Sequence, residues 1–293
     1  MLSLCDKNFF SFFMKKILLG VVVLLVMVSC KREKSESELA EERLGMIQQC
    51  YSEKLYSSAL NHIDTLNTLY PKQVKYRKQA REIFLQIQIE EQERNRIFID
   101  SLLVEKREDF NQNVSKFKFE KDEKYQTVGN YILKSQDYTM PNGGVMLKPF
   151  VEENGRFLIH SLYVGEYALK HISIRLKVGD MSIESEDVLV ASGYNYTFND
   201  GEYVNETVIY RSDRNKEIAS FVEDHFQQTI KVTLNNGKRG YTYVLTPTEK
   251  NALIDAYALS VRLTDLRELE RNLNIANNKL SVFQQELQTL KAE

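Results

Sequence analysis

Two long segments without glycine or proline bracket the middle of this chain. Residues 72–116 follow Pro71, and residues 248–292 follow Thr246-Pro247, so each segment is 45 residues long. Because glycine and proline are the strongest helix breakers, each segment predicts one continuous helix, about 67 Å long at a rise of 1.5 Å per residue. Thr246 and Glu249 form a capping-box pattern around Pro247, which marks the start of the second helix. The fold is therefore expected to be built around two long helices.

Both segments carry an apolar seam with the spacing of a coiled coil. Apolar residues at alternating steps of three and four form one stripe along a helix, which packs against a similar stripe. The first segment carries Tyr76, Ala80, Ile83, Ile87, Phe98, Leu102, Phe110 and Val114, and the second carries Leu263, Leu266, Leu269, Leu273, Ala276, Leu280, Phe283, Leu287 and Leu290. We expect the two helices to clasp each other antiparallel as a stalk. Self-pairing in a homo-oligomer is the alternative that the seams leave open.

Charge predicts a register for this pairing. If both helices meet the intervening residues at the same level, the polar interval 90–96 faces the charged stretch 267–271. The expected neighbours are then Arg94 beside Arg271, Glu90, Glu91 and Glu93 near Arg267 and Arg271, and Arg96 near Glu268 and Glu270. Exposed ion pairs add only about 0.2–1 kcal/mol each, but they help to select a register.

Residues 118–246, between the long helices, alternate as β-strands do. Runs rich in β-branched and aromatic residues occur at 128–133, 157–164, 171–178, 203–210, 229–234 and 240–245, separated by turn sequences such as Asn199-Asp200-Gly201. One helix is expected from about 213 to 225, with Ser212 as its N-cap. The chain is therefore predicted to be α+β, with an inserted antiparallel β-sheet or sandwich that carries one helix.

Residues 39–71 predict a helical hairpin that breaks near Ser52-Glu53-Lys54. Its second helix carries Ala59, Ile63 and Leu66 on one face and ends before Pro71. This spacing resembles the tetratricopeptide repeat, which is about 34 residues long, although Ile47 stands where that family has a small residue. A generic helical hairpin fits the same residues.

The N-terminus has the pattern of a secretory signal. Lys15 and Lys16 precede an apolar run at 17–28, which is too short to span a bilayer. Val28-Ser29-Cys30 resembles the lipobox of bacterial lipoproteins, and the resemblance implies cleavage before Cys30 and acylation of its thiol and amine. We expect residues 1–29 to be the signal peptide, with Met14 as the true start, and residues 30–38 to be a polar tether. An uncleaved signal anchor is the alternative.

The resemblance to Gram-negative lipoproteins also implies a location. Lys31, where an aspartate would direct retention, fits export to the outer membrane. The membrane would then be one partner, bound through the lipid on Cys30, with either face of the outer membrane open. Removing residues 1–29 leaves 36 basic and 40 acidic side chains, a near-neutral balance that gives no nucleic-acid footprint.

Motifs for catalysis, metals and cofactors are not found in the sequence. The four histidines, His62, His160, His171 and His225, have no metal-ligand helix spacing, and no nucleophile-elbow, zincin, P-loop or dinucleotide pattern occurs. His160 and His171 lie on neighbouring predicted strands and could approach each other. Cys50 is the only cysteine after Cys30, so no disulfide within the mature chain is expected. We therefore predict no catalytic residue, no cofactor, no metal and no enzyme activity.

Tyrosine is concentrated in the predicted β region, which holds eleven of the sixteen tyrosines. The pairs Tyr194/Tyr196 and Tyr241/Tyr243 each lie on one strand face, where they could stack on sugar rings, fill a partner's pocket or simply pair across strands. We predict a lipid-anchored scaffold or adaptor for a protein or an envelope polymer. The alternative is a ligand- or carbohydrate-binding or processing lipoprotein, with a concave tyrosine-lined cleft and converging acids such as Glu152, Glu166 or Glu206.

Overall fold

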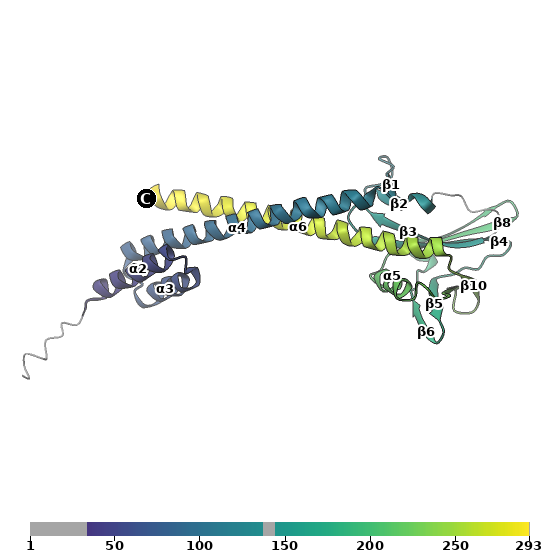
Figure 1. Cartoon of the computed structure of the whole chain (residues 1–293), viewed down its shortest axis with the longest axis horizontal. Coiled ribbons are helices and arrows are strands. Elements are labelled where there is room, and N and C mark those ends of the chain that lie inside the picture. The colour runs from purple at the N-terminus through teal and green to yellow at the C-terminus, as the bar shows by residue number, and fades with distance from the viewer. Residues whose placement is uncertain (1–33, 137–143, 293) are drawn as a thin grey trace, which may run out of the picture. The chain divides into compact units, whose positions relative to one another are not determined.

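The protein is α+β, as the sequence predicts. A computed structural model describes residues 34–136 and 144–292, so Cys30 and the predicted signal peptide lie outside the described residues. The chain divides into two compact units: residues up to 92 with those from 280 onward, and residues 93–279. The long helices α4 (Val74–Val114) and α6 (Pro247–Ala292) contribute to both units (Figure 1). Within the described ranges, no helix is both long enough and apolar enough to cross a membrane.

The first unit contains the predicted helical hairpin. Helices α2 (Glu36–Ser52) and α3 (Tyr56–Leu69) are joined at Lys54, whose φ is +59°. Apolar side chains of α2, α3 and the first turns of α4 form one core: Ala40, Leu44, Ile47, Ala59, Ile63, Leu66, Ala80, Ile83 and Ile87. The predicted polar tether is already helical from Glu36. Ser35 and Glu38 form a capping box there, which starts α2 before the first apolar residue.

The two long helices pack together antiparallel, as predicted. In the second unit, ion pairs join Lys116 to Asp255 (2.8 Å), Asp109 to Arg262 (2.7 Å), Lys106 to Asp265 (3.8 Å) and Arg107 to Glu270 (2.9 Å). The residue numbers of the paired side chains decrease along α4 as they increase along α6, so the two helices run antiparallel. Ile99, Leu103 and Leu266 form the buried seam between the helices. The predicted seam residues Phe98, which is 61 % exposed, and Leu102 are therefore each wrong by one position. In the first unit, Arg81 Nε donates to Glu286 at 2.9 Å.

The predicted register of the long helices is wrong. Lys116 faces Asp255, seven residues further along α6 than residue 248, where an equal-level alignment places it. Glu270 therefore pairs with Arg107 instead of Arg96, and Arg267 donates to the carbonyl of Glu153. Glu90 accepts hydrogen bonds from the hydroxyls of Tyr51 and Tyr56. The register is shifted because the first turns of α6 pack in the core of the two-sheet part of the second unit, here called the β domain. These turns lie beyond the end of α4.

The start of α6 is bonded to both sheets of this domain. The predicted capping box is confirmed, because Glu249 N donates to Thr246 Oγ1 and Thr246 N donates to the Glu249 carboxylate. The same carboxylate is 2 % exposed and accepts from Leu147 N at 2.9 Å and from the Tyr243 hydroxyl at 2.8 Å. Next to it, Lys250 donates to the carbonyls of Phe226 and Gln228.

Among the residues that the structure describes, ten antiparallel strands form two sheets in the second unit. The first has the order β1 (Phe117–Glu120), β2 (Asn130–Leu133), β3 (Gly144–Glu152), β4 (Phe157–Gly165), β8 (Tyr203–Tyr210) and β7 (Asn195–Asp200). The second has the order β10 (Gly240–Val244), β9 (Lys231–Asn235), β5 (Ser173–Val178) and β6 (Met181–Glu184). Six of these strands were predicted to within two residues at each end, whereas β1, β3, β6 and β7 were not predicted.

One core fills the space between the two sheets. It contains Ile159, Val208 and Tyr210 from the inner face of the six-stranded sheet and Ile174, Leu176 and Leu234 from the four-stranded sheet. Helix α5 (Arg214–Asp224) adds Ile218 and Val222, and the start of α6 adds Ala252, Leu253 and Ala256. The six-stranded sheet therefore has a buried inner face, and its other face is here called the outer face.

Helix α5 does not use the predicted cap. Asp213 is at the N-cap position and no side chain caps the helix, so Ser212 is not its N-cap. Asn215 anchors the start of the helix instead, because its buried side-chain amide donates to the carbonyls of Tyr210 (2.8 Å) and Phe157 (3.2 Å). The helix is thus held directly to the six-stranded sheet.

A disulfide test can distinguish the observed register from the equal-level one. A Cys50→Ser chain carrying Leu103→Cys and Leu266→Cys should form an intramolecular disulfide on mild oxidation, because both leucines belong to the same buried seam. A mobility shift on a non-reducing gel measures it. In the matched control, Leu259→Cys replaces Leu266→Cys, one heptad or about 10 Å away. Cross-linking of the control pair alone, or cross-linking only between chains, would contradict the register.

Candidate functional site

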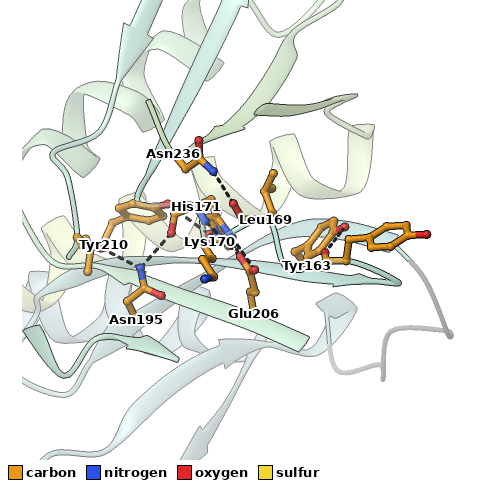
Figure 2. Close-up of polar contacts among 11 residues, drawn as sticks. Tyr163, Leu169, Lys170, His171, Asn195, Glu206, Tyr210 and Asn236 are labelled. Carbon is orange, nitrogen blue, oxygen red and sulfur yellow. Dashed lines mark hydrogen bonds and ion pairs between the residues drawn. The ribbon is translucent and has the colours of Figure 1, made fainter. Parts of the chain in front are cut away.

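A buried polar network lies where the chain passes from one sheet to the other. On β4, Ser161 Oγ is 2.6 Å from Nε2 of His171, which lies two residues before the start of β5. His171 Nδ1 lies 2.7 Å from the carboxylate of Glu206 on β8, to which it donates because a carboxylate can only accept. The Tyr210 hydroxyl is 3.3 Å from Ser161 Oγ. Figure 2 shows His171 between Tyr210 and Glu206.

Backbone contacts bind the connecting segment into this network. Glu206 accepts from the backbone N–H groups of Lys170 (2.6 Å) and His171 (3.2 Å). Lys170 has a φ of +59°, an unfavourable value for a residue with a side chain, so Glu206 stabilises a strained bend. Asn195 donates to the carbonyls of His171 and Val188, and Asn236 donates to that of Leu169 (Figure 2). The network therefore joins the two sheets.

The order Ser161, His171 and Glu206 is that of a nucleophile triad. Such a triad acts only when a substrate carbonyl can reach the hydroxyl beside oxyanion-stabilising donors. Here Ser161 and His171 are 0 % exposed, and Ser161 does not line the surface hollows near this part of the β domain. The nearby N–H groups of Lys170 and His171 are bonded to Glu206. We therefore interpret Ser161, His171 and Glu206 as a structural network that holds the two sheets together, and call it the buried latch.

The ionised form of Glu206 is the favoured one. Burial opposes its ionisation, but the hydrogen bonds from His171 and from the backbone N–H groups of Lys170 and His171 outweigh burial and lower its pKa. A negative charge on Glu206 therefore contributes to folding at neutral pH.

His160 and His171, which the sequence left open as possible neighbours, lie on opposite faces of the six-stranded sheet. Successive side chains on a strand point to opposite faces, so Ser161 points inward to His171 and His160 points to the outer face. There the His160 ring stacks on Phe150 with centroids 4.0 Å apart. Within residues 34–136 and 144–292, no three His, Cys, Asp or Glu side chains gather closely enough to hold a metal ion.

The outer face carries a groove of about 580 Å³. Its walls include Tyr125, Tyr194 and Tyr196, and its floor includes Leu158, His160 and Ile209. Tyr194 and Tyr196 are 40 % and 49 % exposed, and Tyr125 is 76 % exposed, so their rings are available to a ligand. We call this hollow the outer-face groove.

Fixed charges line one side of the outer-face groove. Arg211 lies 3.0 Å from the Glu152 carboxylate, and its guanidinium lies over the ring of Tyr194, 4.8 Å from the centroid. Glu152 also accepts from Asn154 (3.0 Å) and lies 3.9 Å from Arg156. These contacts hold Tyr194 and Arg211 in place. The side chain of Arg156 is 51 % exposed and so has donors available to a ligand.

His160 is a neutral group in the floor of this groove. Burial, together with the positive charges of Lys148 and Arg211, lowers the pKa of His160 to about 3. Its buried Nε2 has no hydrogen-bond partner among the described residues. A buried polar atom without a hydrogen-bond partner destabilises the fold by about 1–3 kcal/mol. Such atoms are rare in native structures, so this one is unusual in a sheet face that serves only stability.

The other residues singled out in the sequence lie elsewhere. Of the three acids expected in a cleft, Glu152 lines the groove, Glu206 belongs to the buried latch and Glu166 is exposed. Tyr243 of β10 donates to Glu249, and Tyr241 of β10 packs edge-on against Tyr163 of β4 in the other sheet, so neither tyrosine makes the cross-strand pair that was one expectation. Cys50 packs against the core of the first unit, and Cys30 lies outside the described residues.

Comparison with known proteins adds no further information on this site. No family model matches the chain, and neither a curated protein nor a solved structure shows significant similarity to it.

The latch can be tested by removing the charge of Glu206. Glu206→Gln should lower the free energy of unfolding by about 3 kcal/mol at pH 7, because it leaves buried donors without a carboxylate. Urea unfolding followed by tyrosine fluorescence measures this in a chain without tryptophan. Glu202→Gln, exposed on the turn before β8, is the matched control and should change stability by less than about 0.5 kcal/mol.

The same variant predicts a pH dependence. The pKa of Glu206 is lowered in the folded state, so its contribution is complete above the unfolded pKa of about 4.3 and is lost as pH falls through the folded value. The gap between wild type and Glu206→Gln should therefore shrink below about pH 4. A gap that is small at pH 7, or that widens in acid, would contradict the latch.

Proposed function

We propose that this chain is a lipid-anchored binding protein of a bacterial cell envelope, in which the β domain holds an envelope ligand in its outer-face groove. Two independent features support the proposal. The sequence around Cys30 supports a membrane anchor, and the outer-face groove supports ligand binding. The observation that carries the binding function is a concave, tyrosine-lined hollow whose side chains are held in place by the Arg211–Glu152 pair.

The groove favours binding of a ligand over catalysis. Its Glu152 carboxylate is paired with Arg211, and burial with nearby positive charge keeps His160 neutral by lowering its pKa to about 3. General acid–base catalysis instead needs a group whose pKa lies near the working pH. The arrangement supplies stacking surfaces and hydrogen-bond donors, which are the requirements for recognition.

An adaptor for a protein partner is the second candidate. Strand β7 is at an edge of the six-stranded sheet, and Phe198 on it is 56 % exposed. Leu189 and Val190, just before β7, are 59 % and 65 % exposed. An exposed edge strand with apolar side chains can accept a strand from another protein.

The anchor is tested at Cys30. Metabolic labelling with an alkyne fatty acid should mark the wild-type chain, and Cys30→Ser should be unlabelled and released to the soluble fraction, because a chain without acyl groups loses its attachment to the bilayer. Cys50→Ser is the matched control and should keep both the label and the membrane fraction. Membrane fractionation of an unlabelled Cys30→Ser chain would contradict the lipid anchor.

The binding function is tested with a polymer fraction. Protease-treated, protein-free envelope polymer from the producing bacterium should raise the melting temperature of the full mature chain in detergent, because a ligand that binds only the folded state stabilises it. Tyr194→Ala with Tyr196→Ala should abolish the shift. Tyr167→Ala, which removes a tyrosine that is 77 % exposed and does not line the groove, should preserve it.

Two other results would change the conclusion. A shift that needs the untreated, protein-containing fraction would favour the adaptor. The absence of any shift with either fraction would contradict a binding function for this domain.

A further inference from the structure

A second hollow continues the outer-face groove toward α5. It has a volume of about 560 Å³ and shares Asn154, Arg156 and Arg211 with the groove. Because the two hollows have walls in common, one extended ligand can occupy both. A single small molecule would fill only one of them.

The second hollow, here called the basic hollow, has a surplus of positive charge. Arg156, Arg211 and Lys216 line it, and Asp213 is the one acid among its lining residues. Lys216 lies 2.8 Å from Asp213, and Arg211 lies 3.0 Å from Glu152 of the neighbouring groove. Arg156 lines the hollow, is 3.9 Å from Glu152 and is 51 % exposed, so its guanidinium is accessible to a ligand. The planar guanidinium of an arginine can donate two parallel hydrogen bonds to a carboxylate.

The opposite end of the outer-face groove has the reverse charge. There a third hollow shares Gln126, Asn130 and His160 with the groove and is lined by Glu120, Asp122 and Glu123 against a single Lys121. Lys118 forms an ion pair with Glu120, which leaves Asp122 and Glu123 against Lys121 at this end, so an anionic group is bound more favourably at the basic hollow. The charges therefore fix the direction in which an acidic ligand lies.

The middle of the groove suits sugar rings. Tyr194 and Tyr196 expose their rings to the groove. Asn130 and Asn154 also line it, and their side-chain amides can donate hydrogen bonds to sugar hydroxyl groups and accept hydrogen bonds from them. A peptide would more often use a strand edge or a deep apolar pocket, and the groove instead crosses the face of the sheet among polar side chains.

Building on the proposed function, we propose that the outer-face groove and the basic hollow together bind an oligosaccharide that ends in one carboxylated sugar. Neutral sugar rings stack on Tyr194 and Tyr196, and the terminal carboxylate is bound by Arg156 and Lys216. A uniformly acidic polymer is disfavoured by Asp122 and Glu123 at the other end.

The test compares matched sugars on the full mature chain in detergent by titration calorimetry. The probes are a panel of oligosaccharides, each built of uncharged sugars and ending in one glucuronic acid, and the same sugars after reduction of the carboxyl group. At least one acidic sugar should bind about tenfold more tightly than its reduced form, since about 1.4 kcal/mol of charge-assisted bonding corresponds to that ratio.

Two sets of variants assign the two parts of the site. Arg156→Met with Lys216→Met should remove the difference between acidic and reduced sugar and weaken the acidic sugar by a larger factor than the reduced one. Tyr194→Ala should weaken both sugars by a similar factor. Arg175→Met, on β5 of the other sheet, is the matched control for loss of an exposed arginine and should leave both affinities as in wild type.

Several results would overturn the assignment. Equal binding of acidic and reduced sugars, a difference that survives Arg156→Met with Lys216→Met, or tighter binding of polygalacturonate or polyglutamate would each do so. If no sugar in the panel binds but the protein-free envelope fraction still raises the melting temperature, the carboxylated-sugar assignment is wrong and the binding function stands. If neither has an effect, both are wrong.

Discussion

The carboxylate of Glu249 is the interaction on which the arrangement of the β domain depends. It caps the start of α6 through Thr246, accepts the backbone N–H of Leu147 on β3 and accepts the hydroxyl of Tyr243 on β10. One buried group therefore satisfies a helix end and fixes that helix to a strand of each sheet. The cost of burying a carboxylate is offset only if all of its oxygens are hydrogen-bonded, and here both oxygens are.

This anchor also determines the pairing of the long helices. Because Ala252, Leu253 and Ala256 pack in the β-domain core, the coiled-coil part of α6 starts further along the helix than its first residue. The charged pairs then form wherever this offset places them, and they contribute little to the choice of register. A buried core therefore outweighs exposed charge complementarity in setting which residues of α4 and α6 meet.

The sequence was sufficient to predict features with local signals. The absence of glycine and proline in two segments, the Thr246–Glu249 capping box and the steps of three and four all act within a few residues, so both long helices were predictable. Strand β3 was missed because Lys148 and Pro149 interrupt its apolar run, and β7 because Asn195, Asn199 and Asp200 are typical of turns. A tyrosine-lined cleft was one alternative from the sequence, but the latch and the charged side of the groove could not be predicted, since Ser161 and Glu206, or Glu152 and Arg211, become neighbours only through strand pairing. Glu152 was the one groove charge that sequence reasoning named.

The β domain is inserted between two helices, so it is joined to the rest of the chain twice. Phe117 of β1 follows closely on the end of α4, and Val244 of β10 lies just before the start of α6. A protease that cuts one of these connections leaves the domain covalently attached through the other. Double attachment therefore keeps the β domain on the rest of the chain after a single nick, whereas a domain at a chain terminus would be shed.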